Sequence, residues 1–297
     1  MEGRIQKRLK GVWKEAECLT LCKNSRLVLM SDCHRGCGNW GDNFQANQHL
    51  FFAALSYYRD RGFCYIELGD GDELWENRHY KDIITTHSHA FWLMAELYRQ
   101  NRFYMLYGNH DRKKENRRFL KEQCHCYYCE SECRVRELFP DILAREGLVL
   151  NTSDGHEILL LHGHQGDLLN DTFWRLSRFL VRYFWRRMEL AGFRDPTSAA
   201  KNYRKKKKIE KRLADFATEE GVLLITGHTH RPVFPKPGEG MYFNDGSCVH
   251  PRCITALEIE RERIALVKWQ VAVREEGSLY VEREVLEGPV RLADYFG

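Results

Sequence analysis

The chain has 297 residues, of which 43% are hydrophobic and 30% are charged, and its net charge is +4. This length can bury a sizeable core, and the composition excludes wholesale disorder. The charge is uneven, because residues 168–220 contain 14 Lys or Arg residues and only 7 Asp or Glu residues. A basic segment in an otherwise mildly acidic chain predicts a local surface for anionic partners.

The N-terminal segment is charged and lacks the apolar stretch of a secretion signal. No run approaches the ~18 consecutive apolar residues of a membrane-spanning helix. We therefore expect a cytoplasmic protein whose 11 cysteines are reduced thiols or metal ligands rather than disulfides.

Five short apolar runs predict buried β-strands, and each run ends in a polar cluster. In chain order these are residues 26–30 before Ser-Asp-Cys-His, 63–68 before Gly-Asp, 103–107 before Gly-Asn-His-Asp, 158–161 before His-Gly-His, and 222–226 before Gly-His-Thr-His. Helical patterns at 45–59 and 80–100 separate the first three runs. This alternation predicts an α/β fold with parallel strands, in which ligands bind beyond the carboxyl ends of the strands.

The C-terminal part has a different pattern, in which strand-like segments follow one another with short turns. These segments are residues 241–244, 253–260, 263–272 and 278–285. We expect them to form mainly antiparallel strands of a second sheet that packs on the first. We assign the whole chain, residues 1–297, to a single domain.

Seven polar side chains at the ends of the predicted strands form a candidate metal site. They are Asp32, His34, Asp70, Asn109, His162, His228 and His230. Carboxylate, amide and imidazole ligands without an obligatory thiolate suit manganese first, with iron and zinc as alternatives. In Asp-x-His and His-x-His, alternate side chains point the same way, so both can reach one centre. Asp72 competes with Asp70 for this role, and His164 competes with His162.

The ordered motifs resemble those of the calcineurin-like metallophosphoesterases. The matching segments are SDCH (31–34), GDGDELW (69–75), GNHD (108–111), LHGH (161–164) and GHTHRP (227–232), followed by FNDGS (243–247). The resemblance implies a four-layer sandwich, in which helices flank two central β-sheets. It also implies a centre of two divalent cations at the edge of these sheets.

The resemblance also assigns each ligand to a cation. One cation would be held by Asp32, His34 and His230, and the other by Asn109, His162 and His228. Asp70 would bridge the two cations, because the sequence from Gly69 to Trp75 matches the family pattern better with Asp70 than with Asp72 as the ligand.

Two cations roughly 3.5–4 Å apart can clamp the attacking and leaving oxygens of an in-line displacement, and they can supply hydroxide near neutral pH. We expect a bridging hydroxide to attack phosphorus directly, without a phospho-enzyme. His110, next to Asn109, is the candidate proton donor to the leaving oxygen. Asp111 would orient the His110 imidazole or stabilise its charged form.

The segment between the His162 and His228 motifs is too long for a simple connection. Residues 168–220 predict a helical cap insertion over the metals, with helices at 173–187 and at about 198–218. Within the first helix, Arg175, Arg178 and Arg182 recur at helical spacing. We expect these arginines to contact the substrate or an anionic membrane surface.

Two arginines outside the cap are further candidates for contact with substrate phosphate. Arg35 follows the ligand His34, and Arg252 follows the turn at 244–247. The guanidinium fork matches phosphate oxygens, although each position also suits a structural salt bridge.

A cap at this position also resembles UDP-2,3-diacylglucosamine diphosphatase, a branch of the same family. That branch usually has Arg where this chain has His110, and HGD where this chain has the six residues from His162 to Asp167. The sequence therefore predicts hydrolysis of a phosphodiester, phosphomonoester or pyrophosphate, with a preference for a nucleotide- or lipid-linked pyrophosphate. The alternatives are a nucleic-acid phosphodiesterase that uses the basic cap, and a non-catalytic scaffold that binds a membrane or a partner.

Four cysteines lie close together in the sequence, at Cys124, Cys126, Cys129 and Cys133. Four thiolates could bind a structural zinc ion. Cys126 and Cys129 have CxxC spacing, but no second such pair follows at the distance typical of zinc sites, so a surface insertion with reduced cysteines is the other interpretation.

Overall fold

The computed structural model describes residues 2–129, 132–167 and 203–297. A seven-stranded sheet has the strand order β14-β13-β12-β2-β3-β4-β7. Its strands are β2 (Arg26–Met30), β3 (Cys64–Leu68), β4 (Phe103–Leu106), β7 (Ala144–Arg145), β12 (Cys253–Glu260), β13 (Arg263–Val273) and β14 (Leu279–Arg291). The neighbours β2, β3, β4 and β7 are parallel, whereas β12, β13 and β14 are antiparallel.

A second, five-stranded sheet has the order β1-β8-β9-β10-β11. Its strands are β1 (Glu17–Thr20), β8 (Gly147–Asn151), β9 (Glu157–Leu161), β10 (Leu223–Thr226) and β11 (Tyr242–Asn244). All of its pairs are parallel except the β8–β9 hairpin. The two sheets therefore both present the carboxyl ends of parallel strands, and these ends carry the predicted ligands.

The assignment of strands to sheets differs from the prediction. The C-terminal strands β12–β14 do not form a separate sheet, because β12 pairs with β2 and so extends the first sheet. β11 pairs with β10, and β9 and β10 belong to the second sheet rather than the first. Apolar patterning locates strands along the chain, but their neighbours depend on hydrogen bonds between distant segments.

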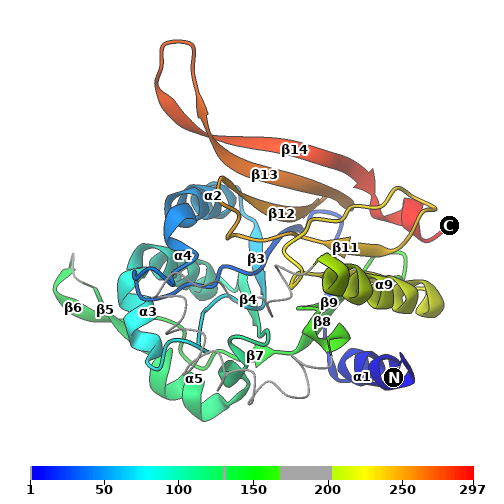
Figure 1. The fold of residues 1–297 in the computed structure, drawn as a ribbon, viewed down its shortest axis with the longest axis horizontal. Helices are drawn as coiled ribbons and strands as arrows, with labels where there is room; N and C mark the ends of the chain where they lie inside the picture. The colour runs from blue at the N-terminus through cyan, green and yellow to red at the C-terminus, as the bar shows by residue number, and fades with distance from the viewer. Residues whose placement is uncertain (1, 130–131, 168–202) are drawn as a thin grey trace.

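Helices cover the outer faces of both sheets. Leu29 and Ile66 of one sheet pack against Leu160 and Ile225 of the other, so the central core lies between the sheets. The α-helices of the described residues are α1 (Glu2–Glu15), α2 (Gln48–Asp60), α3 (Tyr80–Thr86), α4 (Ser88–Arg99), α5 (Arg117–Gln123) and α9 (Tyr203–Glu220). The seven-stranded sheet is covered by α2, α3 and α4, and the five-stranded sheet by α1 and α9 (Figure 1). This arrangement confirms the predicted α/β four-layer sandwich.

Of the two predicted cap helices, the second, at about 198–218, is α9, and its position corrects that part of the prediction. Its buried residues Ile209, Leu213 and Phe216 pack on the outer face of the five-stranded sheet, so α9 is a layer of the sandwich rather than a cap helix. The apolar positions are spaced by three and four residues, which places them on one face of the helix. The first predicted cap helix, with Arg175, Arg178 and Arg182, lies outside the described residues.

Two further features complete the fold. The predicted helix at 80–100 is divided into α3 and α4 at His87. A small hairpin is formed by β5 (Cys126–Cys129) and β6 (Arg134–Glu137), and the long β13–β14 hairpin extends beyond the body of the molecule (Figure 1). None of the helices in the described parts of the chain combines the length and apolarity needed to cross a membrane.

Candidate metal centre

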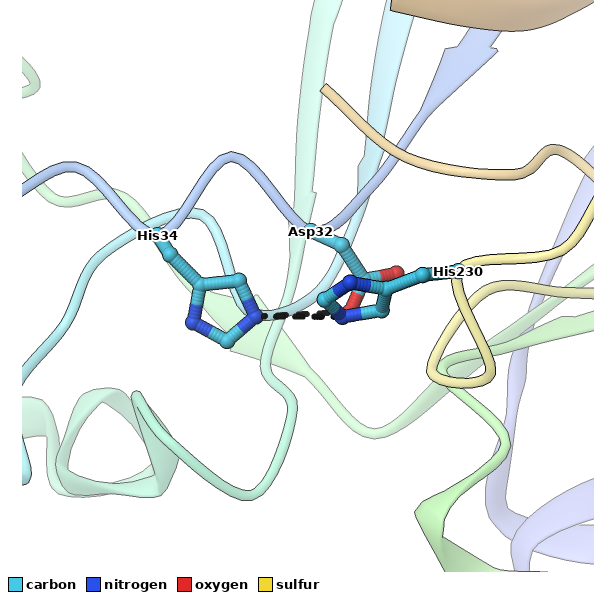
Figure 2. A group of neighbouring side chains, drawn as sticks. All are labelled: Asp32, His34 and His230. Carbon is cyan, nitrogen blue, oxygen red and sulfur yellow. Dashed lines mark hydrogen bonds and ion pairs between the residues drawn. The ribbon is translucent and has the colours of Figure 1, made fainter. Parts of the chain in front are cut away.

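The predicted ligands converge at one edge of the sandwich, which we call the polar edge (Asp32, His34, Asp70, Asn109, His162, His228 and His230). Figure 2 shows the first group of three, in which Asp32 and His34 follow β2 and His230 follows β10. His230 Nε2 lies 2.9 Å from Asp32 Oδ1 and 3.4 Å from His34 Nε2. His34 Nε2 lies 3.6 Å from the same carboxylate oxygen. Three donor atoms this close together can bind one cation.

A second group consists of Asp70, His162 and His228. His162 Nε2 lies 3.1 Å from Asp70 Oδ2. The same carboxylate oxygen lies 3.8 Å from His34 Nε2 of the first group. Asp70 thus lies between the two groups, the position that a bridging carboxylate requires.

Asn109 lies beside this second group. His110, the next residue, donates its backbone N–H to Asp70 Oδ1 at 2.8 Å. The Asn109 side chain is 1% exposed, and its amide makes no hydrogen bond within the described residues. Because a buried amide without a partner is costly, this oxygen fits the role of a ligand.

The backbone of the polar edge is strained. Asp32, His34, Asp70, His228 and His230 have φ values between 47° and 67°, in the left-handed region that residues with a Cβ rarely adopt. Such conformations cost roughly 1–3 kcal/mol each and cluster at functional sites. At the polar edge, they turn the side chains of consecutive strand ends towards one centre.

Hydrogen bonds on the far side of the rings orient the ligands. His162 Nδ1 lies 2.9 Å from the carbonyl oxygen of Leu68, and His34 Nδ1 lies 3.1 Å from Glu73 Oε2. Both contacts favour a proton on Nδ1, which leaves the Nε2 lone pair facing the site. Asp32 Oδ2 accepts hydrogen bonds from the Ser31 hydroxyl at 2.5 Å and from the His228 backbone at 2.8 Å, so its other oxygen faces the ligands.

The charges of the polar edge are strongly coupled. Burial disfavours the charged form of Asp70, but His162 and His110 outweigh it and hold the pKa of this carboxyl far below its usual range. Burial also disfavours charged His162, yet Asp70 and Asp32 raise the pKa of this imidazole to about 9. Burial lowers the pKa of His228 and of His230. The site is therefore rich in negative charge that protons or cations neutralise.

The orientation of His110 corrects one prediction. His110 Nδ1 lies 2.7 Å from Glu73 Oε2, and its ring stacks on Trp75 with centroids 4.1 Å apart. Asp111, the predicted partner, instead accepts hydrogen bonds from the backbone N–H groups of Gly108 and Gly71. The predicted role of Asp111 is therefore wrong, because its side chain folds back onto the loops that carry the ligands.

Sequence reasoning missed Glu73, although it stands within the quoted GDGDELW segment. Its Oε2 contacts Nδ1 of both His34 and His110, and its Oε1 accepts from the Trp75 backbone at 3.1 Å. Burial opposes its charge, but His110 and His34 lower the pKa of Glu73 to about 2. The only signal in the sequence was its distance of three residues from Asp70, which does not reveal the two imidazoles.

The rival carboxylate Asp72 has other partners. It pairs with Arg35 Nε at 2.8 Å and with Lys114 Nζ at 2.5 Å, and it accepts from the Tyr80 hydroxyl. Arg35 is fully buried and also contacts Glu67 at 2.6 Å. The predicted substrate contact of Arg35 is wrong, since this side chain is buried in ion pairs with Asp72 and Glu67. These pairs favour Asp70 over Asp72 as the ligand.

The other predicted residues have these positions. His164 is buried, with its ring centroid 5.6 Å from that of His162, and burial lowers its pKa well below the usual range. Arg252 is exposed. Among the described residues, no group of potential metal ligands includes Cys124, Cys126, Cys129 or Cys133. Cys124 is buried and Cys133 is exposed.

The comparisons with known proteins agree with this fold and site. The family model of the calcineurin-like phosphoesterases matches residues 25–232, which include every residue of the polar edge. The chain therefore belongs to the calcineurin-like phosphoesterase family, a class of metallophosphoesterases. A search of curated proteins finds no match.

Two solved structures resemble this chain at low sequence identity. A single-mutant Vps29 from Entamoeba histolytica has 15% identity and a TM-score of 0.40, over 88% of this chain and 99% of that chain. Vps29 from Chaetomium thermophilum has 12% identity and a TM-score of 0.40, over 88% of this chain and 96% of that chain.

Proposed function

We propose that this chain hydrolyses a phosphate ester or pyrophosphate bond with two divalent cations bound at the polar edge. One cation would be held by Asp32, His34 and His230, the other by Asn109, His162 and His228, with Asp70 between them. The observation that supports this most is the convergence of two ligand groups, with the Asp70 carboxylate of the second group 3.8 Å from His34 of the first.

The ligand set fits divalent cations. It offers carboxylate oxygens, an amide oxygen and imidazole nitrogens, the mixture that suits manganese, with iron and zinc as alternatives. The Asn109 amide and His228 Nε2 make no hydrogen bond within the described residues, so both keep lone pairs for a cation. When bound, two such cations polarise phosphate oxygens and supply hydroxide near neutral pH.

The protein supplies the proton for the leaving oxygen. His110 lies in a group with His34 and Asp70, and its side chain is partly exposed. Glu73 holds its Nδ1, and Trp75 covers one face of the ring, so Nε2 is free to face the substrate. Glu73 and Asp70 also raise the pKa of His110 against the effect of burial, which favours the protonated form that a general acid needs.

The preferred substrate is a phosphorylated small molecule, specifically a nucleotide- or lipid-linked pyrophosphate such as that of the UDP-2,3-diacylglucosamine diphosphatase branch. Support comes from the basic segment 168–220, whose described part places Lys205 2.7 Å from Asp167 beside His228. Arg175, Arg178, Arg182 and Arg252 would contact phosphate or an anionic membrane. A nucleic-acid phosphodiesterase would use the same positive charge.

Hydrolysis of bis(p-nitrophenyl) phosphate tests the proposal. We expect activity that requires added Mn²⁺, disappears with EDTA and returns when Mn²⁺ is restored. The matched control is Asp32→Asn with His230→Ala, which removes two of the three ligands of the first group. A folded wild-type protein without activity in Mn²⁺, Fe²⁺ or Zn²⁺ would favour the scaffold. Protection of the activity by UDP-sugars would favour a nucleotide- or lipid-linked pyrophosphate as the substrate. Protection by RNA oligomers would favour the nucleic-acid phosphodiesterase.

A further inference from the structure

One lysine at the start of α9 has no acidic partner, although its charged neighbours do. Lys205 pairs with Asp167 at 2.7 Å, and Arg231 pairs with Glu210. Lys206 is half-buried, and its side chain makes no ion pair or hydrogen bond among the described residues. Its ammonium is therefore a positive charge that the neighbouring carboxylates leave unpaired.

The position of Lys206 on α9 directs it towards the loop after β10. Lys206 and Glu210 are four residues apart, so they lie on the same face of the helix, about one turn from each other. Glu210 accepts a hydrogen bond from the Thr229 hydroxyl at 3.0 Å. Thr229 stands between the ligands His228 and His230 in the sequence. The helix face that carries Lys206 thus contacts the loop that carries two of the predicted ligands.

The first turn of α9 is fixed beside the polar edge by a second contact. Lys205 Nζ lies 2.7 Å from Asp167 Oδ2, and the same carboxylate oxygen lies 4.0 Å from His228 Nε2. Lys206 follows Lys205 directly, so it lies between two points at which α9 meets the polar edge. Its backbone is therefore held in place while its side chain keeps its bonding capacity.

The charge of Lys206 interacts with the first ligand group as well. Burial lowers the pKa of Lys206 more than the Glu210 and Asp32 carboxylates raise it. Asp32 belongs to the ligand group with His34 and His230. An ammonium that interacts electrostatically with a ligand carboxylate but forms no bond with it can bind an anion at the same site.

We propose that Lys206 binds a phosphate oxygen of the substrate at the polar edge and favours a dianionic phosphate or pyrophosphate group over a singly charged diester. This inference rests on the proposed function, because the phosphate must be bound at the polar edge. Lysine binds phosphate as a point charge. Since Coulomb attraction is proportional to charge, a dianion gains about twice as much from Lys206 as a monoanion does.

Binding of two anions to the Mn²⁺-loaded full chain tests this inference. At about pH 8, inorganic phosphate is mainly a dianion, whereas dimethyl phosphate is a monoanion. Bound Mn²⁺ relaxes the ³¹P nucleus of an anion beside it, so titrations followed by ³¹P relaxation give both Kd values. We expect Lys206→Met to raise the Kd of phosphate about 10-fold, the loss of one charge-assisted hydrogen bond. The Kd of dimethyl phosphate should rise only about 3-fold, because a doubled attraction squares the change in Kd.

Lys207→Met is the matched control, because it removes the same charge from the next position of α9. Lys207 is exposed and lies over the Tyr203 ring, 4.8 Å from its centroid. This variant should change either Kd by less than about twofold, since exposed charges are screened by salt. Lys206→Arg keeps the charge and should restore most of the affinity for phosphate.

Equal effects of Lys206→Met and Lys207→Met, or unchanged Kd values in Lys206→Met, would overturn the role of Lys206. So would a loss of bound Mn²⁺ from Lys206→Met, measured by mass spectrometry, which would make this residue a support of the metal ligands. Equal fold-changes for the two anions would overturn the preference for a dianion. In all these cases the wild-type chain still binds Mn²⁺ and phosphate. If it binds neither and hydrolyses no ester, the proposed function itself fails.

Discussion

Two buried charged clusters lie side by side in this protein, and they differ in how their charge is neutralised. The ion-pair cluster consists of Arg35, Glu67, Asp72, Asp111 and Lys114, which are all fully buried. Its three carboxylates are matched by two cationic side chains. The seven residues of the polar edge include two carboxylates and four imidazoles but no Lys or Arg, so protons on the imidazoles or bound cations neutralise its charge.

The comparison explains why neighbouring aspartates have different roles. Burying a carboxylate costs several kcal/mol unless a partner neutralises it. Asp72 has that partner in Lys114 and Arg35, and both hold its pKa well below the usual range against the effect of burial. Among the described residues, the partners of the Asp70 carboxylate, two residues earlier, are imidazoles and a backbone N–H.

The ion-pair cluster also supports the polar edge. Asp111 pairs with Lys114 at 2.7 Å and accepts hydrogen bonds from the backbone of Gly108 at 2.7 Å and of Gly71 at 3.1 Å. These glycines lie in the loops that carry Asn109 and Asp70. The ion-pair cluster thus fixes the backbone of the loops at the polar edge.

Neutralising Asp70 and Asp72 in turn tests the difference between the two clusters most directly. We expect Asp70→Asn to lower kcat by at least about 1,000-fold and to remove at least one of two metal equivalents, because cation charge supplies several kcal/mol of transition-state stabilisation. Asp72→Asn should keep both metals in the folded fraction. Metal content by mass spectrometry, together with hydrolysis, measures both effects. A fully metallated, active Asp70→Asn protein would reverse the assignment.

A second prediction separates His110 from the ligands. His110→Ala should slow hydrolysis of alkyl esters by roughly 100- to 10,000-fold, the range of general acid catalysis. It should affect nitrophenyl esters far less, since their leaving group needs little protonation. Glu73→Gln should show the same dependence on the leaving group, with a smaller loss, and should also weaken metal binding through His34. Equal losses on both ester types would argue against proton donation.

The ion-pair cluster should affect stability rather than metal content. Lys114→Met leaves buried carboxylates without their cation, so we expect the free energy of unfolding to fall by about 3–5 kcal/mol. Urea unfolding measures this change. Lys211→Met is the control, because Lys211 forms an exposed i,i+4 pair with Asp215 and should change stability by less than about 1 kcal/mol. Similar values for the two variants would mean that the buried pairs contribute little.

A further prediction concerns the pH dependence of metal binding. Without a cation, the pKa of His162 is about 9, raised by Asp70 and Asp32 against the effect of burial, so this imidazole is protonated at pH 7. A cation must displace that proton, and its affinity should therefore rise by about tenfold per pH unit for each proton released below pH 9. Calorimetry in buffers of different ionisation enthalpy counts the protons. An affinity that is constant from pH 6 to 9 would contradict the coupling.

The sequence determined the positions of the chemical groups along the chain. The predicted strands were observed within one or two residues of their bounds, as for residues 26–30 in β2 and 253–260 in β12, except that the segment predicted at 278–285 extends to Arg291 in β14. Because side-chain burial and strand direction follow local patterning, the ligands at the ends of these runs could be located before any coordinates. The four-layer sandwich followed from the family resemblance of the same motifs.

Only the tertiary structure decided which groups meet. Glu73 rather than Asp111 orients His110, Arg35 is buried instead of open to substrate, and α9 is a layer of the sandwich instead of part of a cap. The pairing of β12 with β2 likewise joins residues far apart in the chain. Hydrogen bonds and ion pairs act over a few ångströms in space, whereas sequence patterns report only what is near along the chain.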